Sequence, residues 1–209
     1  MLVEEQRPNV LFLQESMGDG KVIVVELDSL LKVWNFVSMD AKGKYGGLLL
    51  GWKFNFFHSL NAWATVSGLG VSLYSIQPKM PLSFVNVYDP YLERERFWNN
   101  PFSNECIEKS NLILGRDLNS SLGFSEIWGA QARVDNLSDF FTLKLVDFGL
   151  VDIEPSTLLP TWSNRRVGVD NISKRLDQVL VSTDLLDTDF HFHQWVGHGG
   201  DSDHHPMFL

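Results

Sequence analysis

Short apolar runs, separated by glycines and polar turns, recur along most of the chain. Residues 8–14 begin with a proline, continue as an apolar run from Val10 to Leu13, and are followed by Glu15, which predicts a buried strand with a polar side chain after its end. Residues 21–27 are rich in β-branched side chains, so we expect a strand there too. Further strands are expected at 48–52, 82–87, 111–114, 158–163, 176–182 and 189–196, with a hairpin across 63–76 and a last strand opening at Met207.

The segment from 137 to 148 has a different pattern, because its apolar side chains lie mostly three and four positions apart. This spacing predicts an amphipathic helix. Asp135 or Asn136 would cap its start and Gly149 would end it. A second helix is expected at 92–98. Many short strands with few helices indicate an α+β sandwich.

The composition is that of a globular protein, with 44% hydrophobic and 21% charged residues. No repeat divides the chain, so residues 1–209 are expected to form one domain. No apolar run reaches the roughly 20 residues that a bilayer span needs, and no membrane partner is expected. Cys106 is the single cysteine, which excludes an intramolecular disulfide and fits a reducing compartment.

The formal net charge is −9, which is unfavourable for contact with the phosphates of a nucleic acid. One stretch, residues 161–176, has a local net charge of +3 instead. Its basic residues are Arg165, Arg166, Lys174 and Arg175, and its acidic residue is Asp170. This basic patch could meet a phosphate backbone; the alternative is an ordinary exposed loop on an acidic protein.

Side chains that bind metals, carry protons or hold phosphate lie at the ends of several predicted strands. They are Glu15, Asp117, Asn119, Asp177, Asp203 and His204. Mg²⁺ prefers carboxylate oxygens and keeps waters for a substrate phosphate. An adjacent Asp–His pair is a reasonable general base, because a carboxylate orients the imidazole and supports its protonated form. Asp117 and Asn119 could instead form only a turn.

Six motifs containing these residues occur in the order found in the endonuclease/exonuclease/phosphatase superfamily, the deoxyribonuclease-I-like proteins, which the chain resembles. They run from Leu11 to Glu15, Phe84 to Tyr88, Asp117 to Asn119, Thr161 to Asn164, Arg175 to Asp177 and Ser202 to His204. Each motif alone is weak, but six in this order are specific, and the resemblance covers nearly the whole chain. The stretches 162–166 and 172–177 most resemble endonuclease domains of plant LINE-type non-LTR retrotransposons.

The resemblance implies a four-layered αββα sandwich with the catalytic groups at one edge of its two sheets. It also implies that the chain lacks the family's first strand, whose asparagine lies near the metal, and this would impair activity. Glu15 resembles the principal metal ligand and Asp203 a further one, with Mg²⁺ as the metal and Mn²⁺ as the alternative. Arg116 stands where the family has a small residue, and Asp89 stands where glycine is common.

Five residues resemble the catalytic groups of the family. Tyr88 is similar to a tyrosine that contacts the scissile phosphate, and Asp117 to the group that positions or deprotonates the attacking water. Asn119 would hold water or phosphate beside it. Asp177 resembles the carboxylate that pairs with the family histidine, here His204, which contacts the phosphate or acts as a base.

The function that the resemblance implies is Mg²⁺-dependent nicking of DNA. Trp162 resembles an aromatic residue near the nucleotide-binding face, and the basic patch would contact the DNA backbone. The parent element implies a reverse transcriptase domain as a partner. We expect a monomer, and a DNA substrate points to the nucleus.

Three alternatives stay open. A phosphatase or phosphodiesterase acting on inositol lipids or nucleotides would use the same core. A catalytically decayed domain would keep only a binding surface. His191 and His193 lie two apart and could bind zinc together with His198, His204 or His205, although exposed strand histidines are commoner.

Overall fold

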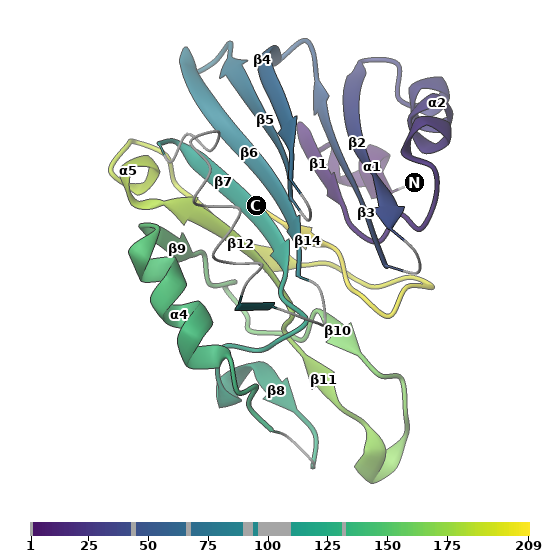
Figure 1. The fold of residues 1–209 in the computed structure, drawn as a ribbon, viewed down its shortest axis with the longest axis vertical. Coiled ribbons are helices and arrows are strands. Elements are labelled where there is room, and N and C mark those ends of the chain that lie inside the picture. Colours follow the sequence, from purple (N-terminus) through teal and green to yellow (C-terminus); the bar gives the residue numbers. More distant parts are fainter. Residues whose placement is uncertain (1, 43–44, 66–67, 90–93, 96–109, 131–132) are drawn as a thin grey trace.

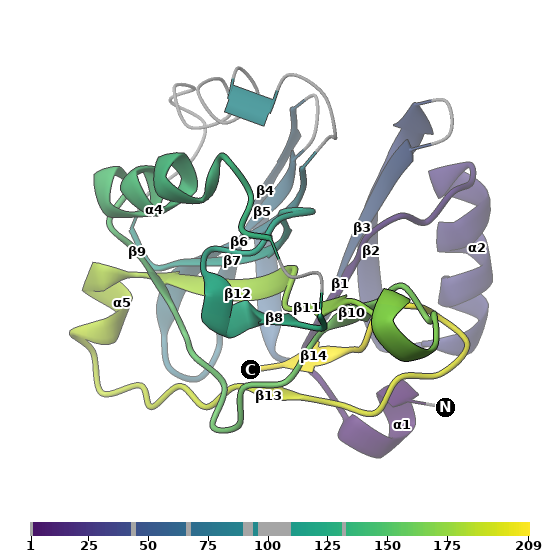
Figure 2. The same ribbon diagram turned by 90° about the horizontal axis from the view of Figure 1, so that it is seen from below.

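The computed structural model describes residues 2–42, 45–65, 68–89, 94–95, 110–130 and 133–209. Two large sheets are stacked face to face, and helices cover their outer faces (Figures 1 and 2). The layers are, in order, α4 (Ser138–Asp147), a six-stranded sheet, a three-stranded sheet and α2 (Gly20–Leu30). The predicted α+β class and the four-layered αββα sandwich are both confirmed.

The six-stranded sheet has the order β4-β5-β6-β7-β12-β9. Its strands are β4 (Phe57–Ala64), β5 (Gly68–Ser75), β6 (Met80–Tyr88), β7 (Leu112–Asp117), β12 (Asp177–Ser182) and β9 (Leu150–Asp152). Strands β6 and β7 run parallel, and the other neighbours run antiparallel. Leu114, Phe141 and Leu180 belong to the core between this sheet and α4.

The three-stranded sheet has the order β1-β3-β2. Its antiparallel strands are β1 (Val10–Leu13), β3 (Tyr45–Lys53) and β2 (Trp34–Lys42), and α1 (Leu2–Gln6) precedes β1. A second core fills the space between the two sheets and includes Leu50, Phe84 and Val181. A Cβ at Gly115 would lie only 3.4 Å from the ring of Phe12, so this face of β7 approaches the opposite sheet closely.

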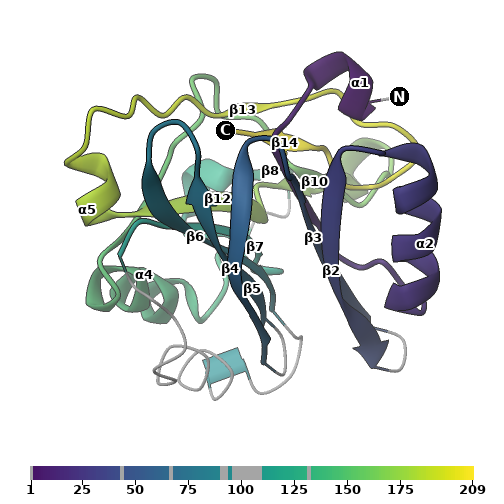
Figure 3. The ribbon, with the colours of Figure 1, turned by 90° about the horizontal axis from the view of Figure 1, so that it is seen from above.

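Two small sheets complete the fold. One consists of β10 (Trp162–Ser163), β11 (Ser173–Lys174) and β8 (Ile127–Trp128), and the other of β13 (Trp195–Val196) and β14 (Met207–Phe208). Figure 1 shows the β10–β11 hairpin extending away from the two large sheets. The segment with β13 and β14 runs from α5 (Thr183–Leu186) toward α2 along one edge of the sandwich (Figure 3).

Residues 21–27 belong to α2, so the strand predicted there is wrong. Asp19 caps the helix, because its carboxylate accepts hydrogen bonds from two backbone amides at 2.8 and 3.4 Å. Ile23 and Leu27, four positions apart, are partly buried, whereas Val25 is exposed. The cap and the packing on β2 therefore outweigh the β-propensity of the run.

Most of the other predicted elements are present. Strands occur at 48–52, 82–87 and 176–182 as expected, but the strand predicted at 111–114 continues to Asp117. β2 had no counterpart in the prediction. The segments predicted as strands at 158–163 and 189–196 each contain only a two-residue strand, β10 and β13, and the rest of each segment lies outside the described strands.

The predicted helix at 137–148 is confirmed as α4. Its N-cap is Leu137, and neither predicted capping residue holds that position; Asp135 instead accepts a hydrogen bond from the Leu137 amide at 2.8 Å. Gly149 ends the helix with a positive φ of 62°, a conformation that glycine adopts without strain. The helix predicted at 92–98 lies outside the described residues except for 94–95. No helix among the described residues is long and apolar enough to span a membrane.

Candidate active site

Three neighbouring strands bring polar side chains into one row at an edge of the six-stranded sheet. Tyr88 is level with Asp117 in the parallel pairing of β6 with β7. Asp117 lies opposite Asp177 in the antiparallel pairing of β7 with β12. Asp117 is buried, and Asp177 is half-buried. Residues that are far apart in the sequence therefore meet because strand pairing places them at the same level.

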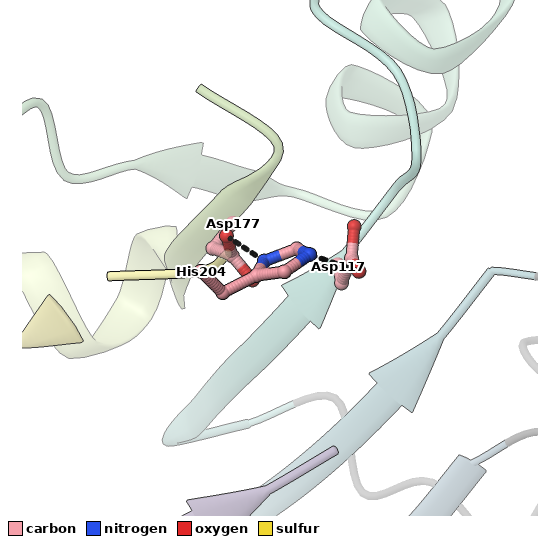
Figure 4. A group of neighbouring side chains, drawn as sticks. All are labelled: Asp117, Asp177 and His204. Carbon is pink, nitrogen blue, oxygen red and sulfur yellow. Dashed lines mark hydrogen bonds and ion pairs between the residues drawn. The ribbon is translucent and has the colours of Figure 1, made fainter. Parts of the chain in front are cut away.

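His204 lies between the two carboxylates (Figure 4). Its Nδ1 is 2.9 Å from Asp177 Oδ2, and its Nε2 is 4.0 Å from Asp117 Oδ2. A backbone bridge to Trp162 holds this part of the chain in place. Burial alone lowers the pKa of His204, but the hydrogen bond to Asp177 and the charges of Asp177 and Asp117 outweigh it and raise the pKa to about 9.

Burial acts on Asp117 in the opposite direction, because it disfavours the charged form of the carboxyl group and so raises its pKa. Burial first, and then the negative charge of Asp177, raise its pKa to about 7. The backbone amide of Asn119 donates a hydrogen bond to its Oδ1 at 2.8 Å and limits this rise. The Asn119 side chain donates to the Asp89 carbonyl at 2.9 Å. Asn119 is thus fixed beside both Asp117 and the end of β6.

Glu15 joins the site from the other sheet, directly after β1. Its Oε1 accepts a hydrogen bond from the hydroxyl of Tyr88. Burial, together with this bond, raises the pKa of the Tyr88 phenol above its usual range, so the phenol keeps its proton. Glu15 itself is exposed, and its backbone has a positive φ of 52°, in the left-handed region. The backbone conformation thus departs from a strand where the carboxylate enters the site.

Two amides hold Glu15 and Tyr88 together, and the sequence prediction did not include them. Gln14 donates to Asn86 Oδ1 at 2.9 Å and to the Val87 carbonyl at 2.8 Å. Asn86 is completely buried and donates to the backbone of the opposite sheet. An asparagine in the middle of an apolar strand was the available signal, because a buried amide must be hydrogen-bonded.

Trp162 and Asp203 form a contact beside His204. The indole Nε1 donates to Asp203 Oδ2 at 3.0 Å, and the Ser163 amide donates to the Asp203 carbonyl at 3.1 Å. The charge of Asp203 also raises the pKa of His204. Both predicted residues therefore lie at the site, where Asp203 is exposed and Trp162 is half-buried.

The four basic residues of the predicted patch do not share one surface. Arg175 is only 1% exposed and is paired with Glu126 and Asp152, so its assignment to a substrate-binding surface is wrong. Arg165 is exposed, but its guanidinium donates to the carbonyls of residues 200 and 202, just before Asp203. Arg166 is exposed and Lys174 is half-buried.

The residues at this edge suit a divalent cation. Ligand atoms of Asp117, Asp177 and His204 all lie within 4.8 Å of one another. The charge of Glu15 reaches Asp117 and contributes to its raised pKa. A cation would relieve this repulsion between carboxylates, and oxygen ligands are those that Mg²⁺ prefers. Glu15 and Asp203, the predicted ligands, lie beside this group without being part of it.

The alternative zinc site receives no support within the described part of the chain. His191 Nδ1 is 3.0 Å from the carbonyl of residue 189, and the ring of His193 stacks on Trp195. Among the candidate histidines, only His204 belongs to a group of metal-binding side chains there, and the other members are Asp117 and Asp177.

The sequence matches no protein-family model and no curated protein, but solved structures resemble the chain closely. The endonuclease domain of TRAS1, a telomere-specific non-LTR retrotransposon, has a TM-score of 0.73 and 18% identity, covering 99% of this chain and 87% of that one. The catalytic domain of Xenopus laevis APE2 has a TM-score of 0.69 and 13% identity, covering 99% and 84%. A mannosyl-6-phosphatase from Bacteroides thetaiotaomicron has a TM-score of 0.63 and 14% identity, covering 99% and 86%.

The fold is therefore that of the endonuclease/exonuclease/phosphatase proteins, which confirms the resemblance seen in the sequence motifs. At these identities the likeness establishes the fold alone. An endonuclease and a sugar phosphatase share it, so the substrate has to be inferred from the residues of this chain.

We predict that the metal-free protein becomes less stable as the pH rises from about 6.5 to about 9. Because the pKa of His204 is raised from 6.5 to about 9 on folding, the folded chain binds this proton more tightly than the unfolded chain. The resulting stabilisation, about 3 kcal/mol at about 1.4 kcal/mol per pKa unit, is complete below pH 6.5 and is lost as the pH passes through about 9. Urea unfolding in EDTA across this range measures it, and a His204→Gln variant with the same pH slope as the wild type would contradict it.

Proposed function

We propose that this chain is a divalent-metal-dependent phosphodiesterase that nicks DNA. The observation that supports the proposal is the grouping of Asp117, Asp177 and His204. Within it, the carboxyl group of Asp117 and the imidazole of His204 face each other, and the pKa of each is raised. Tyr88 and Glu15 meet at the same edge. Perturbed pKa values that cluster in this way are typical of catalytic sites.

Each side chain has a role that follows from its protonation state. Asp177 orients the imidazole of His204, which with a pKa of about 9 is protonated at neutral pH and can donate to a phosphoryl oxygen. Asp117, with a pKa of about 7, can accept a proton from an attacking water. The protonated hydroxyl of Tyr88 can donate to the phosphate, and Asn119 holds water or phosphate beside Asp117.

The bound metal would be Mg²⁺, with Mn²⁺ as the alternative. Glu15 and Asp203 would hold it, and Asp117 would lie close to it. When bound, such an ion polarises the phosphodiester and offsets the negative charge that develops as the bond breaks. The three carboxylates would otherwise repel both one another and an anionic substrate.

DNA is the proposed substrate because basic and aromatic residues of β10, β11 and the loop between them suit a long phosphate backbone. Arg166 lies on the β10–β11 hairpin, which extends away from the sandwich (Figure 1), and Lys174 lies on β11. Trp162, half-buried beside His204, offers an aromatic ring to a nucleotide. A phosphatase for a small ester would not need a projecting basic hairpin.

The origin and setting of the protein are also proposals. The sequence motifs, together with the likeness to the TRAS1 endonuclease domain, support descent from a LINE-type element whose reverse transcriptase is a partner. A DNA substrate favours the nucleus, and we propose that the domain acts as a monomer.

The proposal predicts that purified protein with Mg²⁺ converts supercoiled plasmid to the open-circular form. Asp117→Asn and His204→Ala should each lower the nicking rate by about 100-fold or more, because each removes a proton-transfer or charge-stabilising group. Agarose-gel time courses with equal amounts of folded protein measure the effect.

The exposed residue Glu26 on α2 provides a matched control, since Glu26→Gln should nick at the wild-type rate. Equal nicking by every variant would identify a contaminating nuclease. An intact plasmid combined with hydrolysis of inositol phosphates or nucleotides would favour the phosphatase alternative. No hydrolysis of any of these substrates would indicate a decayed domain.

Metal binding should be measurable without catalysis. A ligand at about 100 times its Kd stabilises a folded protein by about 2.7 kcal/mol, so millimolar Mg²⁺ should raise the melting temperature by several degrees. Glu15→Gln should remove most of this shift, and Glu26→Gln should leave it intact. A melting temperature that does not respond to Mg²⁺ or Mn²⁺ would show that these carboxylates do not form a metal site.

A further inference from the structure

A cluster of buried polar side chains lies directly behind the candidate active site. Arg116 pairs with Gln178 between β7 and β12, and the next pair along the ladder is Asp117 with Asp177. Successive side chains of a strand point to opposite faces. Arg116 and Gln178 therefore lie on the face toward α4, whereas the two carboxylates lie on the face toward the three-stranded sheet.

A continuous chain of contacts links the members of this cluster, which we name the Arg116 cluster. Arg116 donates to Gln178 Oε1, and Gln178 donates to Glu126 Oε1 at 3.2 Å. Arg175 donates to the same Glu126 oxygen at 2.8 Å and to both oxygens of Asp152 at 2.6 and 2.7 Å. The cluster thus joins β7, β12 and β9 to the 3₁₀ turn Phe124–Glu126.

Glu126 also connects the cluster to the loop that follows Asn119. Its second carboxylate oxygen accepts a hydrogen bond from the Leu122 amide at 2.6 Å. Its backbone carbonyl accepts from the Arg175 amide, two residues before Asp177, at 3.0 Å. The chain segments that leave β7 and enter β12 are therefore both hydrogen-bonded to one residue, Glu126.

The cluster is balanced in charge and mostly buried, with the half-buried Asp152 at its margin. Arg116, Arg175 and Gln178 are 2%, 1% and 1% exposed. Burial lowers the pKa of Arg116 to about 9 against the charges of Asp152 and Glu126, so it stays cationic at neutral pH. Apolar side chains of similar volume often give equal or greater stability than such buried charges. A stability role alone therefore does not account for them.

The end of the β7–β12 ladder is where a constraint is needed. Asp117 and Asp177 are its last pair, and like charges directly opposite each other in a sheet repel. The contact from Arg116 to Gln178 is one pair away, on the opposite face, where it resists the separation of the two strands. His204 can bridge the carboxylates only while their spacing is kept.

We propose that the Arg116 cluster is a positioning device, which holds Asp117 and Asp177 at the spacing that seats His204. Arg116 is a positioning residue, because it acts on the carboxylates through Gln178 and the pairing of β7 with β12. The activity arm of its test rests on the proposed function, whereas the spectroscopic arm does not.

The test replaces Arg116 with a side chain of similar length that has no hydrogen-bond donors. Arg116→Met should lower kcat by about tenfold or more and change KM by less than about twofold. The groups that bind the substrate remain, whereas the alignment of Asp117, Asp177 and His204 is lost. In the metal-free protein, the NMR signal of the His204 Nδ1 proton, held by Asp177, should shift or broaden. Arg116→Lys, which keeps the charge and one donor, should restore part of both.

Matched variants separate positioning from stability. Leu145→Ala truncates a buried side chain of the core under α4 and should lower the melting temperature without the loss of kcat or the NMR change. Arg133→Met removes an exposed arginine and should change neither. The double variant Arg116→Met with Glu126→Gln keeps the buried charges balanced, so it should fold even where the single variant is unstable.

An unchanged His204 signal in folded Arg116→Met, or in the double variant, would overturn the proposal. A loss of kcat that Leu145→Ala reproduces at the same melting temperature would overturn it too. If the wild type hydrolyses no phosphodiester, the proposed function fails, and the His204 signal still decides whether the cluster positions the carboxylates.

Discussion

The antiparallel pairing of β7 with β12 places Asp117 directly opposite Asp177, and the site is arranged around this contact. Two neighbouring carboxylates, one of them buried, repel each other, so binding of a proton or a cation that neutralises part of their charge is favoured. His204 takes that place. Burial lowers its pKa but the hydrogen bond and charge of Asp177 raise it, whereas burial and the charge of Asp177 both raise the pKa of Asp117. The negative charge of Asp177 thus contributes to both shifts, while the attraction between His204 and Asp117 raises the pKa of His204 and lowers that of Asp117. A metal ion or a protonated imidazole lowers the free energy of the same arrangement.

Local patterns predicted the strands correctly where a short apolar run is buried and is bounded by polar or turn residues. The apolar runs of β1, β6 and β12 are bounded by polar or turn residues, and each forms a strand near the predicted position. The run at 21–27 shows the limit of this reasoning. Its β-branched residues favour a strand locally, but the side chain of Asp19 and the surface of β2 favour a helix. Neither influence is visible in the run itself.

The candidate site was predictable to the extent that its polar residues end strands. Glu15, Asp117, Asp177 and His204 all lie at one edge, because strand order and the stacking of the two sheets, neither of which the sequence states, bring those parts of the chain together. Groups whose partners are distant in the sequence were missed, as with the buried amides between the sheets. Arg175 was misassigned because counting charge along a segment ignores which face each side chain occupies.

The net charge of −9 is unchanged when the charges of the Arg116 cluster are set aside, because that cluster sums to zero. Arg116 and Arg175 balance Glu126 and Asp152 there, so the field that an approaching phosphate meets stays negative overall. The exposed carboxylates at the site, those of Glu15 and Asp203, would repel DNA until a divalent ion is bound. Association with DNA would then depend on the metal more than on the basic hairpin. The guanidinium of Arg165 is hydrogen-bonded to the loop before Asp203, so Arg166 is the one exposed cation left to contact DNA among the described residues of the hairpin. In such a protein, loading of the metal would control substrate binding as well as catalysis.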